Sequence, residues 1–568
     1  MISCALRRAL PNEANVTDVL ERVKTMVCRA LHIVYRMIEA RTPLSRGLGP
    51  LDSRFEVSPE VHELTMFSSH SICAVVAAPD AASMWRQFVR AQRLAQTIEL
   101  RLDWLVHDRE IARFLVRLGK PPPPRATCIA TCRQVAAGGR YRGSVGNQLL
   151  HLAEALRAGC TWYDLEIESA SACPPELLEV LLGEGERMLS AHFFRAMPRR
   201  HARVLQELSR LHPRAVKIAA QCGSLGEALA LLRLARGRRE VVTVPMGEVA
   251  LPARILALRH GSALAYAAIE NATAPGQLSF DEMKSLYRAD QLTRRTRVYG
   301  VIGDPIGHSL SPQMQNAGLQ ARKVDAVYLP FLVRDLKDFL ASIAPLGIAG
   351  FSVTLPHKQR ILRHLDGCDP LAAAIGAVNT VVVRGGGKLY GYNTDYVGVL
   401  RALERRAPLR GSRTLIFGAG GVARAVAFAL TQAGASVCIC ARRAEKARSL
   451  ARAVRAEAVA RNRLRYEFFD AIVNATPVGM HPQAAQSPLE ARELNCRLLF
   501  DTIYRPRATK LMQLAALRDI ETVSGVEMFV AQGTAQWEIW TGERAPAEVM
   551  RRAVLQALAR EEKMQARR

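Results

Sequence analysis

Eight short apolar or β-branched runs alternate with helical patterns between residues 72 and 290, and this repetition restricts the fold more than any other feature. Each gap between runs has room for a crossover helix, so we expect the runs to pair as parallel strands. Eight such units in one domain predict an α/β fold with a closed (β/α)8 barrel over residues 66–290. The runs are 72–78, 97–103, 126–132, 161–168, 188–194, 214–220, 240–246 and 263–269.

A chain of 568 residues is too long for one hydrophobic core, and the rest of the sequence divides accordingly. Residues 1–65 form an N-terminal extension in which 16–41 has the pattern of an amphipathic helix. After a charged joint at 290–297, strand and helix patterns alternate again over 297–400. At 414–430 a strand, a glycine-rich turn and a helix follow one another, which predicts a nucleotide-binding domain over 401–523.

The formal net charge of +26 indicates anionic partners, either nucleic acid or acidic metabolites. The arginines are scattered and aromatic residues make up only 6%, so small anions are favoured and nucleic acid is not expected. An arginine-rich base composition is an alternative source of the charge. None of the 12 cysteines lies in a zinc-binding pattern, and no run is apolar over the roughly 18–20 residues that span a bilayer. We therefore expect a cytoplasmic protein with reduced thiols, no metal and no membrane contact.

Charged residues lie at the ends of two predicted barrel strands. Residues two apart share a strand face, so Glu99, Arg101 and Asp103 point the same way, as do Asp164 and Glu166. At the C-terminal end of a barrel strand such groups normally belong to the active site. The alternative is an internal ion-pair network that only closes the mouth of the barrel.

Lys217 stands inside the apolar run 214–220, where an ammonium loses its hydration. Desolvation and nearby arginine charge favour the neutral amine, which attacks a carbonyl to form an imine. His192 ends the preceding run, and side chains on neighbouring parallel strands can reach one carbonyl compound. Although a lone histidine is more often a core residue, this pair indicates a nucleophile with a general acid/base.

Polar groups recur between residues 300 and 395 in loops that follow predicted strands. They supply the donors and acceptors that a polyhydroxy acid requires, although each loop alone could be a simple polar turn. A lysine–aspartate couple can also move a proton to or from an alcohol oxygen. The groups are Ser309, Ser311, Thr354, Lys358, Asn379 and Asp395.

The glycine-rich turn 418–424 follows a strand and opens an apolar helix, as a pyrophosphate-binding turn does. The next strand is followed by Ala441, Arg442 and Arg443 instead of the acidic residue that binds the ribose of NAD. Arg442 would bind a 2′-phosphate, so NADP(H) is the expected cofactor. The alternative is that the two arginines merely begin a surface helix.

In this order, the motifs IELRLD, YDLEIE, SAHFF, AVKIA and ATAPGQ resemble type I 3-dehydroquinate dehydratase over about residues 70–290. The resemblance implies that Lys217 forms a Schiff base with the C3 ketone of 3-dehydroquinate. His192 would remove the C2 proton and protonate the leaving C1 hydroxyl, with Glu166 orienting it. Arg254 would bind the carboxylate. The remaining implied contacts are Glu99, Arg101 and Arg133 on the hydroxyl side, and Thr273 and Gln277 in a lid loop.

Residues 297–560 resemble shikimate dehydrogenase, also through NATPVGM (474–480), DTIYRPRATKL (501–511) and GVEMFVAQGTAQWEIWTG (525–542). The resemblance implies that Lys358 and Asp395 are the catalytic pair, and that helices 524–560 return to the shikimate-binding domain 297–400. The implied shikimate contacts are Ser309, Ser311, Thr354, Asn379, Tyr504 and Gln532. The implied cofactor contacts are Gly418, Ala419, Gly420, Gly421, Val422, Ala423, Ala441, Arg442, Arg443, Thr476, Met480, Ile503 and Gly525.

The two resemblances describe consecutive steps, because the 3-dehydroshikimate made by the first is the substrate of the second. They imply a bifunctional enzyme of the shikimate pathway that produces shikimate with NADPH. A catalytically inactive relative that senses pathway metabolites is the alternative, but it would have lost Lys217, His192, Lys358 or Asp395, and all four are present. A preference for quinate and NAD in the second half stays open, as does a homo-oligomer.

Overall fold

The computed structural model of the chain describes residues 67, 70–274, 276–404, 406, 408–480 and 483–566. The helix predicted over 16–41 lies outside these residues. The chain forms two compact units. The first contains residues up to 223 with 230–284 and 289–291, and the second contains 224–229, 285–288 and 292 onward.

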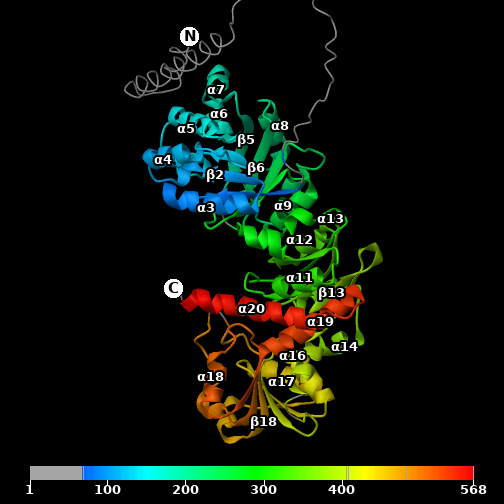
Figure 1. The fold of residues 1–568 in the computed structure, drawn as a ribbon. Coiled ribbons are helices and arrows are strands. Elements are labelled where there is room, and N and C mark those ends of the chain that lie inside the picture. Colours follow the sequence, from blue (N-terminus) through cyan, green and yellow to red (C-terminus); the bar gives the residue numbers. More distant parts are fainter. Residues whose placement is uncertain are drawn as a thin grey trace, which may run out of the picture. The chain divides into compact units, whose positions relative to one another are not determined.

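The first unit is a parallel barrel of eight strands in the order β7-β6-β5-β4-β3-β2-β1-β8 (Figure 1). Ala263 N donates to Val241 O (2.9 Å) between the two ends of this order, so the sheet returns on itself and is nearly closed. The predicted barrel is confirmed. Its strands are β1 (Ser71–Val76), β2 (Thr97–Arg101), β3 (Thr127–Thr131), β4 (Trp162–Glu166), β5 (Glu186–Phe193), β6 (Ala215–Gln221), β7 (Val241–Met246) and β8 (Leu264–Ala268).

Helices cover the outside of the barrel, and their sequences explain where they begin. In α3, the side chain of Asp80 caps the first turn by accepting from Ser83 N (2.8 Å). Met84, Phe88 and Ala91 then recur at helical spacing and are buried on the side that packs against β1. The helices are α3 (Ala81–Leu94), α4 (Asp108–Leu118), α5 (Val145–Arg157), α6 (Ile167–Ser171), α7 (Pro175–Leu182), α8 (His201–Ser209), α9 (Leu225–Arg233) and α10 (Leu251–Ile255).

Most of the predicted strands are shorter in the structure, and for β2 and β4 the early end changes where charged residues lie. β2 ends at Arg101, and a 3-10 turn over Leu102–Trp104 carries Asp103. The sequence analysis placed Asp103 on the same strand face as Glu99 and Arg101. In the structure Asp103 lies beyond the strand, so the two-residue periodicity does not apply to it. β4 ends at Glu166, and the next residue begins α6.

The second unit contains two six-stranded sheets. The first sheet has the order β10-β9-β11-β13-β14-β12 and is mixed, because β13 runs antiparallel to both neighbours. Its elements are β9 (Arg297–Gly303), α11 (Ser311–Ala321), β10 (Ala326–Leu332), α12 (Leu336–Ala341), α13 (Ile343–Leu346), β11 (Ile348–Val353), β12 (Gly367–Cys368), α14 (Pro370–Ile375), β13 (Thr380–Val383), β14 (Leu389–Tyr392) and α15 (Asp395–Leu403).

The second sheet has the order β17-β16-β15-β18-β19-β20, and all of its strands are parallel. Counted within the sheet this is the order 3-2-1-4-5-6 of a dinucleotide-binding fold, whose crevice opens beside β15 at the switch point. The elements are β15 (Arg413–Phe417), α16 (Gly421–Gln432), β16 (Ser436–Cys440), α17 (Ala444–Val454), β17 (Glu457–Ala458), β18 (Phe469–Asn474), β19 (Cys496–Asp501), α18 (Lys510–Ala516) and β20 (Glu521–Ser524).

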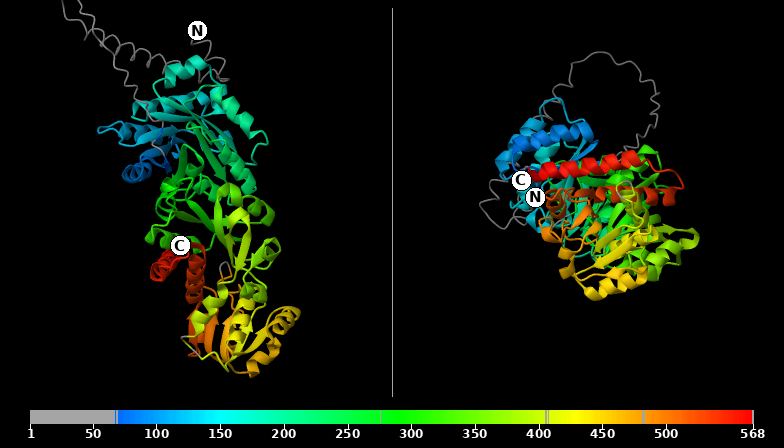
Figure 2. Two further views of the ribbon diagram at one scale, coloured as in Figure 1. Left: turned by 90° about the vertical axis from the view of Figure 1, so that its right-hand side faces the viewer. Right: turned by 90° about the horizontal axis from the view of Figure 1, so that it is seen from below.

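The last two helices, α19 (Gly525–Thr541) and α20 (Ala547–Ala566), pack on elements of the first sheet of this unit (Figure 2). α19 contacts α15 and β13, and α20 contacts α11. The indole of Trp540 donates to Val381 O (3.1 Å), which fixes α19 along β13. Within the described residues, no helix is both long and apolar enough to cross a membrane.

Candidate active sites

A cavity inside the barrel collects most of the residues that the sequence analysis selected. Lys217 and His192 both line it, because Ser190 pairs with Lys217 and Ala219 pairs with His192 in the β5–β6 register. The two side chains thus point to the same face, one step apart. The lining also includes Glu99, Arg101, Arg133, Phe194, Tyr266, Arg254, Thr273 and Gln277.

The amine of Lys217 is buried between two carboxylates. Its Nζ lies 3.0 Å from Glu99 Oε1 and 2.9 Å from Asp164 Oδ2, and 4.1 Å from the centroid of the Tyr266 ring. The sequence analysis considered desolvation and arginine charge, which favour the neutral amine, but not these two anions, which stabilise the ammonium. Lys217 thus lies in a double ion pair, from which its amine must be released before it can attack a carbonyl.

Asp164 is the centre of this network, although the sequence analysis gave it no role. It accepts from Arg133 Nη2 (2.8 Å), Lys217 Nζ (2.9 Å) and Ser190 Oγ (2.6 Å). Burial alone would raise the pKa of Asp164, but Arg133 and Lys217 outweigh it and hold that pKa well below its usual range. The period-two pattern placed Asp164 on the inner face, but only the register shows that it contacts Lys217.

His192 is a neutral imidazole whose tautomer is set by Arg133. Nη1 of Arg133 lies 3.0 Å from His192 Nδ1, and because a guanidinium only donates, Nδ1 accepts and Nε2 carries the hydrogen. Burial, with the charges of Arg133 and Lys217, lowers the pKa of His192 well below its ordinary value. The one lone pair of this neutral ring lies on Nδ1, so His192 can take up a proton only after Arg133 has released that nitrogen.

Glu166 lies behind this cavity. Its carboxylate accepts from Gln134 N (2.7 Å) and Gln148 Nε2 (2.8 Å), and burial raises its pKa. The neighbour of His192 Nδ1 is Arg133, so any influence of Glu166 on the imidazole would pass through the Gln134–Arg133 segment. If Glu166 orients His192, as predicted, it does so indirectly, through the backbone at Gln134 and the side chain of Arg133.

Two further predicted groups close the barrel cavity. Arg254 is 4% exposed on α10, and burial lowers its pKa to about 10. Thr273 donates from N (2.7 Å) and from Oγ1 (3.1 Å) to Gln277 Oε1, so these two residues belong to one small loop.

In the second unit, Lys358 and Asp395 form an ion pair. Lys358 Nζ lies 2.5 Å from Asp395 Oδ2, and Asn379 Nδ2 donates to Asp395 Oδ1 (2.8 Å). Asp395 begins α15, where helix N–H groups favour a carboxylate. Gln532 lies 3.5 Å from Asn379 Nδ2, so α19 also reaches this cluster. The structure therefore joins four of the residues predicted for this half.

The serine-bearing loop borders Tyr504. Ser309 acts on the pKa of Tyr504 and Ser311 on that of Tyr328; both hydroxyls lower a pKa that burial raises. Tyr328 OH also lies 2.6 Å from Ser352 Oγ, which donates to Gln536 Oε1 (2.8 Å). The sequence analysis did not select Tyr328, Ser352 or Gln536. The one sign in the sequence was that each is a polar residue among largely apolar neighbours.

The glycine-rich turn adjoins the lysine of this pair. A Cβ on Gly421 would lie 3.2 Å from Lys358 Cβ, while a Cβ on Gly420 would meet nothing within 4 Å. Gly418 has φ +133, and a Cβ there would lie 2.7 Å from Ala475 O. The turn is thus packed on two sides and open above the start of α16, which fits a pyrophosphate. Arg442 and Arg443 are exposed just beyond β16.

Four family descriptions match the chain: Type I 3-dehydroquinase over residues 72–294, Shikimate dehydrogenase substrate binding domain over 301–381, NADP oxidoreductase coenzyme F420-dependent over 413–503, and Shikimate 5′-dehydrogenase C-terminal domain over 525–555. The chloroplastic bifunctional 3-dehydroquinate dehydratase/shikimate dehydrogenase of Arabidopsis thaliana is 32% identical over 508 residues, covering 84% of this chain and 83% of the relative. The chain belongs to this bifunctional family.

Its second half is also similar to single-function members. Shikimate dehydrogenase (NADP(+)) of Methanosarcina acetivorans is 42% identical over 277 residues, which cover 46% of this chain and 99% of that protein. A solved structure of shikimate 5-dehydrogenase from Thermus thermophilus, in complex with NADP(H) and shikimate, is 35% identical over 46% of this chain and 99% of its own, with a TM-score of 0.43.

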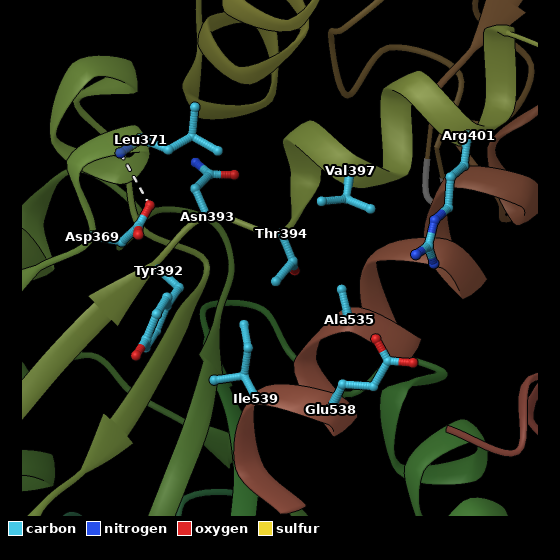
Figure 3. A pocket seen from close by; sticks show the side chains of 10 residues that line it. All are labelled: Asp369, Leu371, Tyr392, Asn393, Thr394, Val397, Arg401, Ala535, Glu538 and Ile539. Atoms are coloured by element: carbon cyan, nitrogen blue, oxygen red, sulfur yellow. Dashed lines mark hydrogen bonds between the residues drawn. The ribbon is translucent and has the colours of Figure 1, made fainter. Parts of the chain in front are cut away.

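This bifunctional dehydratase/dehydrogenase has a further cavity in its second unit, shown in Figure 3. None of the predicted shikimate contacts lines it. Asn393 and Thr394 do, and they also contact the Lys358–Asp395 cluster: Asn393 Oδ1 accepts from Asp395 N (3.1 Å), and Thr394 Oγ1 accepts from Asn379 Nδ2 (3.0 Å). The rest of the lining is Asp369, Leu371, Tyr392, Val397, Arg401, Ala535, Glu538 and Ile539.

The state of His192 leads to a pH prediction for the dehydratase half. Because burial and two cations lower its pKa, the imidazole stays neutral below the pH of about 6.5 at which a free histidine is half protonated. We expect kcat/KM for dehydration to show no histidine-like fall between about pH 8 and 6. Arg133→Gln removes one cation, so the acidic limb should move to higher pH. An acidic limb near pH 6.5 in the unmodified enzyme would contradict the assigned state.

Proposed function

We propose that the barrel dehydrates 3-dehydroquinate to 3-dehydroshikimate and that the second unit reduces this product to shikimate with NADPH. Shikimate binding is assigned to 297–400 with helices 524–560, and cofactor binding to 401–523. For the barrel, the proposal rests on the cavity that Lys217 shares with His192. For the second unit, it rests on the Lys358–Asp395 pair against Gly421.

In the barrel, the freed amine of Lys217 adds to the C3 carbonyl, and loss of water gives an imine. The imine acidifies the C2 hydrogen, which neutral His192 removes once Arg133 has turned from Nδ1 to the substrate and a ring nitrogen is free to accept the proton. The resulting imidazolium then protonates the C1 hydroxyl as it leaves as water, so the histidine returns to its starting state. Addition of water to the product imine releases 3-dehydroshikimate and the amine. Arg254 would bind the carboxylate, and Glu99, Arg101 and Arg133 the hydroxyl groups.

In the second unit, bound NADPH supplies the hydride. Gly418, Gly420 and Gly421 leave room for its pyrophosphate above α16, and Arg442 would bind the 2′-phosphate. Lys358 donates a proton to the carbonyl oxygen that becomes the alcohol, and Asp395 holds that ammonium in place. Ser309, Ser311, Thr354, Asn379, Tyr504 and Gln532 would hold the hydroxyl and carboxylate groups.

A coupled assay tests both halves on the full-length chain. With 3-dehydroquinate and NADPH, we expect NADPH oxidation and shikimate formation. If 3-dehydroshikimate accumulates without NADPH oxidation, the dehydrogenase half of the proposal fails. If added 3-dehydroshikimate is reduced while 3-dehydroquinate is unchanged, the dehydratase half fails.

Cofactor choice is tested at Arg442. Since a charge-assisted contact to a phosphate contributes about 1.5–3 kcal/mol, Arg442→Ala should raise KM for NADPH by about tenfold or more and leave KM for NADH nearly unchanged. Arg452→Ala, later on α17, is a matched control for loss of a surface arginine. Equal losses with both cofactors would remove Arg442 from the 2′-phosphate site. Shikimate and quinate compared in the same assay settle the substrate preference.

The partners belong to the same proposal: small-molecule acids, without nucleic acid or membrane. The ten cysteines of the described residues are all free thiols, which supports the proposed cytoplasmic location.

A further inference from the structure

A wholly buried carboxylate ends β19 and takes no part in the proposed chemistry. Asp501 is 0% exposed. Its Oδ1 accepts from Asn474 Nδ2 (3.0 Å) and Ile503 N (3.1 Å), and its Oδ2 accepts from Thr509 Oγ1 (2.6 Å). A buried carboxylate with three donors from separate chain segments is costly to assemble, so its position calls for an explanation.

The donors belong to two loops at the carboxyl edge of the parallel sheet. Asn474 ends β18, and its Oδ1 in turn accepts from Thr476 N (3.0 Å) and Thr476 Oγ1 (2.8 Å), which sets the course of the loop 475–480. Ile503 and Thr509 lie at either end of the loop that carries Tyr504, and Thr509 caps α18 by accepting from Met512 N (3.2 Å). Asp501 thus ties both loops to one point.

Both loops have almost no space in which to shift. Ala475 O is 2.7 Å from where a Cβ of Gly418 would stand, in the glycine-rich turn. The carbonyl carbon of Ile503 is 2.5 Å from where a Cβ of Gly525 would stand, at the start of α19. A displacement of either loop would therefore reach the turn or the helix directly.

We propose that Asp501, with Asn474 and Thr509, is a positioning residue that holds the two loops carrying the proposed cofactor contacts Thr476, Met480 and Ile503. This deepens the proposed function and rests on it. The carboxylate must be ionised to hold the arrangement, because all three partners donate to it and a protonated Oδ2 would compete with the Thr509 hydrogen.

The inference includes a pH dependence. Burial raises the pKa of Asp501 to about 6. The hydrogen bonds from Thr509, Ile503 and Asn474 act in the opposite direction, and all three of these groups are uncharged. As the pH falls through about 6, Asp501 gains a proton and Thr509 no longer donates to an ionised oxygen, so the arrangement weakens and NADPH should bind more weakly. A raised carboxyl pKa means that the fold takes up this proton more readily than the unfolded chain does. Protonation therefore does not itself destabilise the fold, and the affinity falls without a fall in thermal stability from this group.

The experiment removes the hydroxyl partner. Thr509→Val keeps the shape of the side chain and should raise the Kd for NADPH, measured by titration calorimetry on the full-length chain at pH 7.5, by about tenfold. Thr509→Ser should restore it. Thr431→Val is the matched control, because the buried Thr431 hydroxyl on α16 has no hydrogen-bond partner within the part of the chain that the structure describes. The 2′-phosphate of NADPH also titrates at about pH 6 and contributes its own change in Kd. Asp501→Asn should weaken binding and reduce the change in Kd between about pH 7 and 5 to the part due to that phosphate.

A thermal unfolding curve of each full-length variant reports whether its second unit is folded, and the dehydratase activity of the barrel, which should not change, shows that the rest of the sample is intact. An unchanged Kd in Thr509→Val, or a Kd equally raised in Thr431→Val, would overturn the inference. So would a change in Kd with pH that is as large in Asp501→Asn as in the unmodified chain. If Asp501→Asn does not fold, the threonine variants and the pH dependence of the unmodified chain still decide. Failure of the unmodified chain to bind NADPH would instead refute the proposed function.

Discussion

We expect Lys217→Arg to lower kcat/KM for dehydration of 3-dehydroquinate by roughly 10³-fold or more while reduction of 3-dehydroshikimate stays unchanged. Arginine keeps a positive charge between Glu99 and Asp164 but cannot form the imine, so the loss reports nucleophilic catalysis. Lys217→Ala should lose as much activity, but it also leaves two buried carboxylates without their cation, which destabilises a barrel by about 3–5 kcal/mol.

Trapping provides the direct measurement. Borohydride added with 3-dehydroquinate should reduce the imine and leave a stable adduct on the peptide that contains Lys217, detected by mass spectrometry. Lys120→Ala, which removes an exposed lysine of the same unit, is the matched control and should trap normally. An adduct that persists in Lys217→Arg, or dehydration that continues at an undiminished rate, would exclude the assigned nucleophile.

The second large effect is expected from Asp395→Asn, which should lower kcat for shikimate oxidation by about 10²–10⁴-fold. The amide keeps the size of the side chain but removes the charge that holds Lys358, and Asn379 would then face a group that no longer accepts at both oxygens. Lys358→Met should have a similar effect, and the double variant should lose little more, because the two groups act as a unit.

Dehydratase activity and the Kd for NADPH are the controls for Asp395→Asn, and neither should move. A loss below tenfold, or a parallel loss of NADPH binding, would mean that Asp395 shapes the site without taking part in proton transfer.

The sequence predicted the barrel well, because eight buried parallel strands leave a repeated apolar pattern that few folds share. It also predicted that Lys217 and His192 lie together, since both follow from strand order and two-residue periodicity. The strand ends were less accurate: Asp103 lies in a turn that the pattern of alternating side chains does not reveal.

Contacts across strands could not be predicted, because they depend on register and rotamer. Arg133 therefore appeared as a substrate contact, whereas the structure also makes it the partner of Asp164 and of His192 Nδ1. Asp501 was visible within the motif 501–511, but nothing local indicates that Asn474 and Thr509 meet it. Residues that hold others in place leave a weaker trace in sequence than residues that carry chemistry.

The double ion pair of Lys217 bears on whether its amine reacts with aldehydes other than the substrate. A free amine in an open barrel would condense with glyoxals, sugars and other stray aldehydes, and each adduct would inactivate the enzyme. An ammonium locked between Glu99 and Asp164 is inert to them. A ligand whose hydroxyl groups bind Glu99 and Arg133 would compete with these ion pairs, so release of the amine would be coupled to binding of the ketone.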